Sequence, residues 1–197
     1  MALIKSALEI ALEKTNDIKG DKGSLVTAEG REEGKRLASA FFQDPGLDLA
    51  GRFREIPRDR LPAVREGFFQ IVTANLTLPR DDGSLDQLEV VGKALEAVIK
   101  DRGGLRRLRD QLGQFFRQFL EDRKNLAEAV LKQLSPALRQ KEAQISRQMG
   151  RQVRIDPMAD PDFVKIYNQN MGNLESRYGE VLGRVKAELT GMFEKSA

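Results

Sequence analysis

The chain has 197 residues, of which 32% are charged, 40% are hydrophobic and 6% are aromatic, and its formal net charge at pH 7 is +3. It contains no histidine and no cysteine, which excludes disulfides, imidazole bases, thiolate nucleophiles and zinc, haem or iron–sulfur ligation by this chain alone. A charge-rich composition with few aromatic residues favours helices over a thick globular core. We therefore expect an all-α fold.

The amino-terminal region, residues 1–78, predicts three short helices. Apolar residues recur with helical spacing near the start, and this pattern stops at the glycine-rich stretch 20–24. A second helix is predicted from Thr27 to the Asp-Pro-Gly break at 44–46. The third contains Pro62, which is tolerated in the first turn of a helix.

The remaining region, residues 84–197, predicts longer helices with few breaks. Ser84 and Gln87 have the spacing of a capping box, which predicts the start of a helix. That helix should reach about Lys100, where Gly103 and the glycine after it kink or end it.

The next helix is predicted from Leu105 to Leu134, and its apolar residues step by three and four. Ser135 and Pro136 then suggest that the chain restarts or bends there. We expect this helix to pack along a partner of similar length.

The last helix, predicted from Asp162 to about Phe193, has the repeat of such a partner. Its apolar residues recur close to the 3.5-residue period of a coiled coil, at Met171, Leu174, Tyr178, Val181, Val185, Leu189 and Met192. The predicted fold is thus an elongated helical bundle with a long antiparallel coiled-coil-like hairpin in its C-terminal half. One continuous domain is the alternative to these two regions.

A stripe of small residues lies roughly opposite that apolar seam. It comprises Gly172, Ser176, Gly179, Gly183 and Ala187. Because glycine costs a helix up to about 1 kcal/mol per site relative to alanine, one interpretation is that another backbone approaches there, in a homodimer or a three-helix arrangement. The alternative is an exposed, weakly helical face.

Basic residues concentrate between positions 101 and 150, where 11 Lys and Arg stand against 6 Asp and Glu. Around 102–120 the arginines mostly flank an apolar arc of leucines and phenylalanines, as on an ordinary packed helix, and Arg109 alone intrudes. Exposed as a set they could instead neutralise phosphates of a nucleic acid. The candidate contacts are Arg102, Arg106, Arg117, Arg147 and Arg151. A membrane-surface helix would want fewer carboxylates.

Three other patterns carry weak chemical signals. The stretch 30–36 resembles a phosphate loop but has the wrong spacing and no preceding strand, so Gly30, Gly34 and Ala38 are better explained as the small face of a helix. Asp156, Asp160 and Asp162 could gather around a hard cation, yet helix capping explains them. No nucleophile has an identifiable base. We predict no cofactor and no metal.

These observations favour a non-enzymatic, cytoplasmic protein that binds other proteins, including a second copy of itself, through helical surfaces. No apolar run approaches the length of a transmembrane helix. The rival prediction is a nucleic-acid-binding protein that uses the basic region 102–154. A carboxylate-based enzyme, which would need a concave pocket with two acidic groups, is a third possibility.

Overall fold

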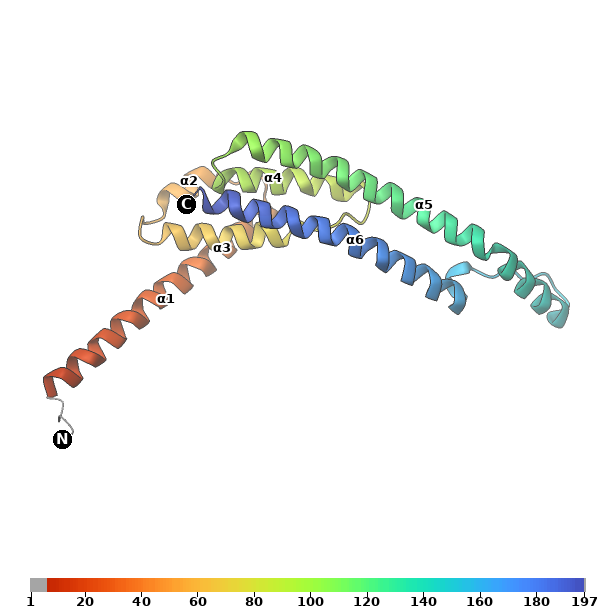
Figure 1. Ribbon diagram of the computed structural model, residues 1–197, viewed down its shortest axis with the longest axis horizontal. Coiled ribbons are helices and arrows are strands. Elements are labelled where there is room, and N and C mark those ends of the chain that lie inside the picture. The colour runs from red at the N-terminus through yellow and green to blue at the C-terminus, as the bar shows by residue number, and fades with distance from the viewer. Residues whose placement is uncertain (1–6, 197) are drawn as a thin grey trace. The chain divides into compact units, whose positions relative to one another are not determined.

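The structure is a computed structural model that describes residues 7–196, with side chains described from Gly23 onward. Six α-helices and two short 3₁₀ helices make up this range, and no strand occurs in it. The α-helices are α1 (Ala7–Gln43), α2 (Leu49–Glu55), α3 (Leu61–Ala74), α4 (Asp86–Val98), α5 (Arg102–Met149) and α6 (Pro161–Glu194) (Figure 1). The 3₁₀ helices are η1 (Asp82–Leu85) and η2 (Pro157–Ala159). The predicted all-α fold class is confirmed.

The break predicted at residues 20–24 is wrong, because α1 is one continuous helix of 37 residues. Glycine lowers helix stability but removes no backbone hydrogen bond, so it does not end a helix that is supported elsewhere. The Thr27 hydroxyl donates to the Gly23 carbonyl oxygen at 2.9 Å, as in a regular helix turn. The predicted beginning of the first helix, before Ala7, lies outside the described residues.

The predicted capping box at Ser84 is also wrong. Asp81 takes the capping position instead, because its side chain accepts hydrogen bonds from the Ser84 backbone N–H and hydroxyl, at 2.9 and 2.7 Å. The chain forms η1 first and continues directly into α4.

The long central helix extends beyond both predicted ends. α4 ends at Val98, and the predicted kink at Gly103 gives way to a new helix that begins at Arg102, with Asp101 accepting from the Gly104 N–H at 2.8 Å. At the other end α5 continues through Pro136 to Met149. A proline lacks only one backbone N–H, and the intact turns on both sides keep the helix continuous.

Contacts between residues divide the chain into two compact units. Unit 1 comprises the described residues up to Leu76, the stretch Glu89–Arg106 and the residues from Thr190 onward; unit 2 comprises Thr77–Leu88 and Arg107–Leu189. Each unit therefore combines stretches that are distant in the sequence. The division of the chain into domains at residues 78 and 84 stays a prediction.

Within unit 1, α1 and α3 touch through small residues. A Cβ atom added at Gly34 would overlap the carbonyl oxygen of Val64, one added at Gly67 would overlap that of Arg31, and one added at Gly30 would lie 2.8 Å from the Cβ of Ala63. Glycine is required here because the two backbones are in direct contact. The interpretation of Gly30 and Gly34 as the small face of a helix is confirmed.

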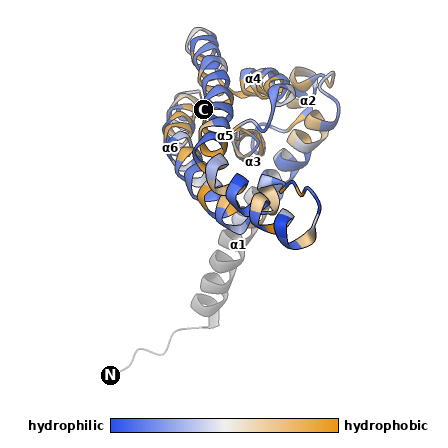
Figure 2. Ribbon diagram, turned by 90° about the vertical axis from the view of Figure 1, so that its right-hand side faces the viewer, coloured by the Kyte–Doolittle hydropathy of each residue, from blue (hydrophilic) through white to orange (hydrophobic). Residues whose placement is uncertain are grey.

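The rest of the unit 1 core is apolar. Figure 2 shows α3 as a largely hydrophobic helix, whereas α5 and α6 alternate between hydrophilic and hydrophobic residues. Phe68 is completely buried and meets the Phe53 ring edge to face, with the ring centroids 5.2 Å apart. Such pairs add stability beyond the burial of their area, so they fix α2 against α3.

Within unit 2, α5 and α6 pack against each other in opposite directions. Phe119 of α5 forms one buried cluster with Met171 and Leu174 of α6. Further along α5, Val130 and Leu138 form a second cluster with Phe163, which lies earlier in α6. The contacts therefore run antiparallel. The coiled-coil character of this pairing stays a prediction.

Candidate functional site

The small residues of α6 lie on an open face. Gly172, Ser176, Gly179, Gly183 and Ala187 are all exposed, and a Cβ atom added at any of the three glycines would find no neighbouring atom within 4 Å. No close approach within the described residues explains these glycines. They differ in this from Gly34 and Gly67, which the chain itself covers.

The prediction that Val181 belongs to the apolar seam of α6 is wrong. Val181 is 40% exposed, and Leu182 is buried in its place, with 5% of its surface exposed. At about 100° per residue, Leu182 lies about 40° from Tyr178 around the helix and Val181 about 60° from it on the other side. The angular position favours Leu182.

The candidate nucleic-acid contacts are exposed. Exposure is expected both of a nucleic-acid contact and of an arginine at the edge of a packed helix face, so it does not distinguish the two interpretations. Arg102, Arg106, Arg117, Arg147 and Arg151 all reach solvent, while the leucines and phenylalanines between the first three are buried or half-buried. Arg102 makes an ion pair with Glu96 at 2.9 Å. Arg109, which the sequence places inside the apolar arc, is half-buried, with its Nη2 atom 3.8 Å from Asp110 Oδ1.

Two of the three aspartates near 160 act as helix caps, and the third, Asp162, lies in the first turn of α6. Asp160 accepts from the Phe163 N–H at 2.9 Å, which confirms it as the cap of α6, and Asp156 accepts from the Met158 N–H at 3.0 Å. Lys141 of α5 donates to Asp160 at 2.6 Å and to Asp162 at 2.7 Å. The bond from Lys141, and then the one from the Phe163 N–H, lower the pKa of Asp160. Across the described residues, no group of three potential ligands is placed to hold a metal ion.

Tyr178 and Asp122 form a hydrogen-bonded pair that shifts the pKa of both groups. The Tyr178 hydroxyl donates to Asp122 Oδ2 at 2.5 Å, and Asp122 also accepts from Gln118 at 2.8 Å. Burial first, and then this hydrogen bond, raise the pKa of Tyr178 to about 12. The bond joins α5 to α6 beside the aromatic contacts of Phe115 and Phe119 with the same ring. The pair therefore ties two packed helices together.

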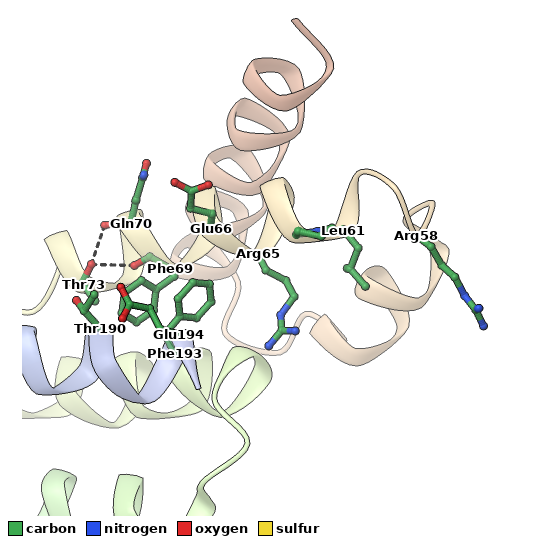
Figure 3. A pocket seen from close by; sticks show the side chains of 11 residues that line it. Arg58, Leu61, Arg65, Glu66, Phe69, Gln70, Thr73, Thr190, Phe193 and Glu194 are labelled. Atoms are coloured by element: carbon green, nitrogen blue, oxygen red, sulfur yellow. Dashed lines mark hydrogen bonds between the residues drawn. The ribbon is translucent and has the colours of Figure 1, made fainter. Parts of the chain in front are cut away.

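A hollow lies in unit 1, along α3 and the end of α6. It has a volume of about 840 Å³. Its apolar floor is built around Phe69 of α3 and Phe193 of α6, whose rings stack with centroids 4.3 Å apart and planes within 9° (Figure 3). Its other lining residues include Leu61, Pro62, Gln70, Thr73, Thr190 and Glu194. The hollow therefore presents mainly apolar surface, in a chain of which 32% of the residues are charged.

Arg65 holds the middle of this region together. Its Nη2 atom donates to the carbonyl oxygens of Val98, at 2.6 Å, and of Ser196, at 3.2 Å. These are carbonyls at or beyond the ends of α4 and α6, so Arg65 satisfies acceptors that a helix end leaves open. Its guanidinium also lies over the Phe193 ring, 6.0 Å from the centroid. Arg65 is thus part of the framework of unit 1.

A second hollow, of about 590 Å³, shares Arg58, Leu61 and Arg65 with the first. Its lining is strongly basic, because Arg54, Arg58, Lys100 and Arg102 stand against the single carboxylate of Glu96. Glu96 is engaged with Arg102. The two hollows therefore adjoin on unit 1, and together they are called the groove, with an apolar part and a basic part.

Sequence reasoning did not find this groove. Its residues come from three stretches, 53–73, 96–102 and 190–194, and only the fold brings them together. The apolar residues around Phe68 do predict that α3 has a buried face. The helical period does not show that Phe69 packs against Phe193. No described helix is long and apolar enough to cross a lipid bilayer.

The fold and the groove together define an all-α protein with an open, amphipathic surface. No curated protein and no solved structure matches the chain. One family does, over residues 50–191, which is most of the chain: the family of unknown function DUF6657. The chain belongs to this family. The match covers α3, α4 and α5 in full and most of α2 and α6.

Proposed function

We propose that this protein acts as a helical scaffold that binds other proteins, including a second copy of itself. The observation that carries the proposal is the open small-residue face of α6. A glycine inside a helix lowers its stability, so its presence is explained when a neighbouring backbone needs the space that a side chain would occupy. In α1 and α3 another helix of the chain uses that space, whereas at Gly172, Gly179 and Gly183 the space is empty in the single chain. A helix from another molecule would fill it.

The experiment replaces Gly179 and Gly183 together by leucine. Leucine side chains would keep a second backbone at a distance, so we expect the mass in solution, measured by light scattering, to fall toward that of the single chain. Helix content, measured by circular dichroism, should hardly change, because both positions are exposed.

The matched control replaces the same two glycines by alanine. Alanine raises helix propensity, as leucine does, but stays small. We expect this variant to keep the wild-type mass. A leucine variant whose mass equals that of the wild-type protein would overturn self-association through this face.

The second candidate function is nucleic-acid binding, with which the exposure of Arg106, Arg117, Arg147 and Arg151 is compatible. Binding would then weaken steeply with salt, because each neutralised phosphate releases counterions. Reversing Arg106 and Arg117 to glutamate should abolish it. Absence of binding to single-stranded and double-stranded probes at low salt would remove this candidate.

A further inference from the structure

We infer that the groove of unit 1 is a binding site for an acidic amphipathic helix of a partner protein. The inference rests on the proposed protein-binding function and adds the chemistry of the partner segment. It concerns a surface of unit 1 to which α2, α3, the end of α4, the start of α5 and the end of α6 contribute. Figure 3 shows its apolar part.

The apolar part of the groove runs along α3 for about three helical turns. Leu61, Arg65, Phe69 and Thr73 follow one another at four-residue steps along one face of α3 and all line it. From Leu61 to Thr73 this face is about 18 Å long, at about 1.5 Å per residue, which matches about three turns of a second helix. Helices that dock in such grooves insert apolar residues at steps of three and four.

The basic part selects the charge of that helix. Arg54, Arg58 and Lys100 are exposed and make no ion pair with any described residue. Arg102 is engaged with Glu96, and Arg65 with backbone carbonyls. Three cations are therefore available at one end of an apolar hollow. Carboxylates on the polar face of a docked helix would complement them, which favours the correct partner and speeds association.

The charge pattern argues against two other occupants. The chain's own first 22 residues carry four lysines and four acidic residues, namely Lys5, Lys14, Lys19 and Lys22 with Glu9, Glu13, Asp17 and Asp21, so they supply no net negative charge. A single-stranded nucleic acid would need exposed aromatic faces for its bases. Phe69 is only 6% exposed and already stacks with Phe193.

The test uses a fluorescein-labelled synthetic peptide of about four helical turns, with leucine and phenylalanine on one face and glutamate on the other. We expect it to bind the full chain, as measured by fluorescence anisotropy, with an affinity that falls as salt is added. A peptide with every glutamate replaced by lysine, and a scrambled peptide without an apolar face, should not bind. No binding of the acidic peptide, or equal binding of a control peptide, overturns the inference.

Variants locate the site. We expect Arg54→Glu combined with Arg58→Glu to weaken binding by about tenfold or more. Lys132→Glu combined with Arg139→Glu is the matched control, because it makes the same charge change on exposed residues of α5 in unit 2. The control should bind like the wild-type chain. Leu61→Ser should weaken binding through the apolar part, at unchanged helix content. Equal loss in both double variants would show a general charge effect and overturn the site.

Two outcomes separate this inference from its alternatives. Decanoate, an anionic amphiphile, should fail to displace the peptide; if it binds more tightly than the peptide, the groove is a lipid site and the inference is overturned. Light scattering on the groove variants should give the wild-type mass. A groove that fails these tests while the α6 leucine variant still loses mass would leave the proposed function standing.

Discussion

Glycines play two different parts in this chain, so the same substitution has opposite expected effects at different positions. Gly34 of α1 is buried against α3, and a Cβ atom there would lie 2.7 Å from the Phe68 backbone nitrogen. We expect Gly34→Ala to lower the free energy of unfolding by about 2 kcal/mol or more, because backbone cannot yield as a flexible side chain does.

Gly113 of α5 provides the matched control. A Cβ atom added there would lie 3.9 Å from the Leu88 Cδ2 atom, an ordinary contact. We expect Gly113→Ala to raise the free energy of unfolding by up to about 1 kcal/mol through helix propensity. Urea unfolding followed by circular dichroism measures both changes. A loss of stability at Gly113 as large as that at Gly34 would contradict the explanation.

Tyr178 is expected to ionise at unusually high pH. Its burial, and then the hydrogen bond and charge of Asp122, raise its pKa from 10.0 to about 12. The folded state therefore keeps a proton that the unfolded state loses. The contribution of this group to stability is complete below about pH 10 and is lost as the pH rises through about 12.

Absorbance of tyrosinate during an alkaline titration measures this pKa. The chain has two tyrosines, so Tyr178→Phe identifies which transition belongs to Tyr178. Asp122→Asn should lower the pKa of Tyr178 but leave it above 10.0, because burial, the largest cause, remains. A transition that does not respond to Asp122→Asn would show that the hydrogen bond has no such effect.

Individual residues were predictable where the cause is local. Asp160 followed by a proline predicts a helix cap from the sequence alone, and the cap is present. Lys141 as the partner of that cap was not predictable, because it lies 19 residues away and meets Asp160 only when α5 packs on α6. The same holds for the Tyr178–Asp122 pair, whose members are 56 residues apart.

At the scale of the elements, Pro136 inside α5 predicts a gain from its removal. The residue is exposed, so little packing is lost, and the Ser135 hydroxyl beside it already bonds to the Leu131 carbonyl at 2.7 Å. Pro136→Ala restores a backbone donor and should raise the free energy of unfolding by up to about 3 kcal/mol.

Pro136→Gly tests the reason for that gain. Glycine also restores the donor but costs a helix about 1 kcal/mol relative to alanine, so the stability should fall in the order alanine, glycine, proline. Thermal unfolding followed by circular dichroism gives the order. A proline chain that is the most stable of the three would mean that a bend at Pro136 is required by the packing around Leu138.

The existence of the helices was more predictable than their ends. Pro62 correctly placed the first turn of α3, and the Asp-Pro-Gly break correctly ended α1 at Gln43. Apart from the cap before α4, where Asp81 takes the place predicted for Ser84, the errors came from treating glycine or proline as a stop. Residues 20–24 and Pro136 lie inside continuous helices, because the cost of such a residue is small beside the hydrogen bonds that flank it.

At the scale of the whole molecule, the groove could not be predicted because unit 1 is discontinuous in sequence. It unites three stretches, and single residues join them: Ser196 accepts from the Lys100 N–H at 2.9 Å and donates to the Met192 carbonyl at 2.8 Å. Amphipathic periods predict that a helix has a partner but not which one. A site whose residues come from such separate stretches can be recognised only in the folded chain.

Sensitivity to acid should be concentrated in unit 2. Of the described carboxyl groups with a lowered pKa, Asp81, Asp122 and Asp160 belong to unit 2, and the exposed Glu32 belongs to unit 1. Each of the three is held by hydrogen bonds, chiefly from Ser84, Tyr178 and Lys141 respectively. A lowered folded-state pKa gives stability that is present above the ordinary value of 3.8 and is lost as the pH falls through the folded value.

Tyrosine fluorescence isolates this effect, since the chain has no tryptophan and Tyr167 and Tyr178 both lie in unit 2. The urea midpoint from tyrosine fluorescence should fall as the pH is lowered through the region around 3.8. In a chain with Asp81→Asn, Asp122→Asn and Asp160→Asn the midpoint should be lower at pH 7 and should change less with acid, because the groups that take up protons are gone. A triple variant that keeps the full wild-type dependence would place the acid-sensitive groups elsewhere in the chain.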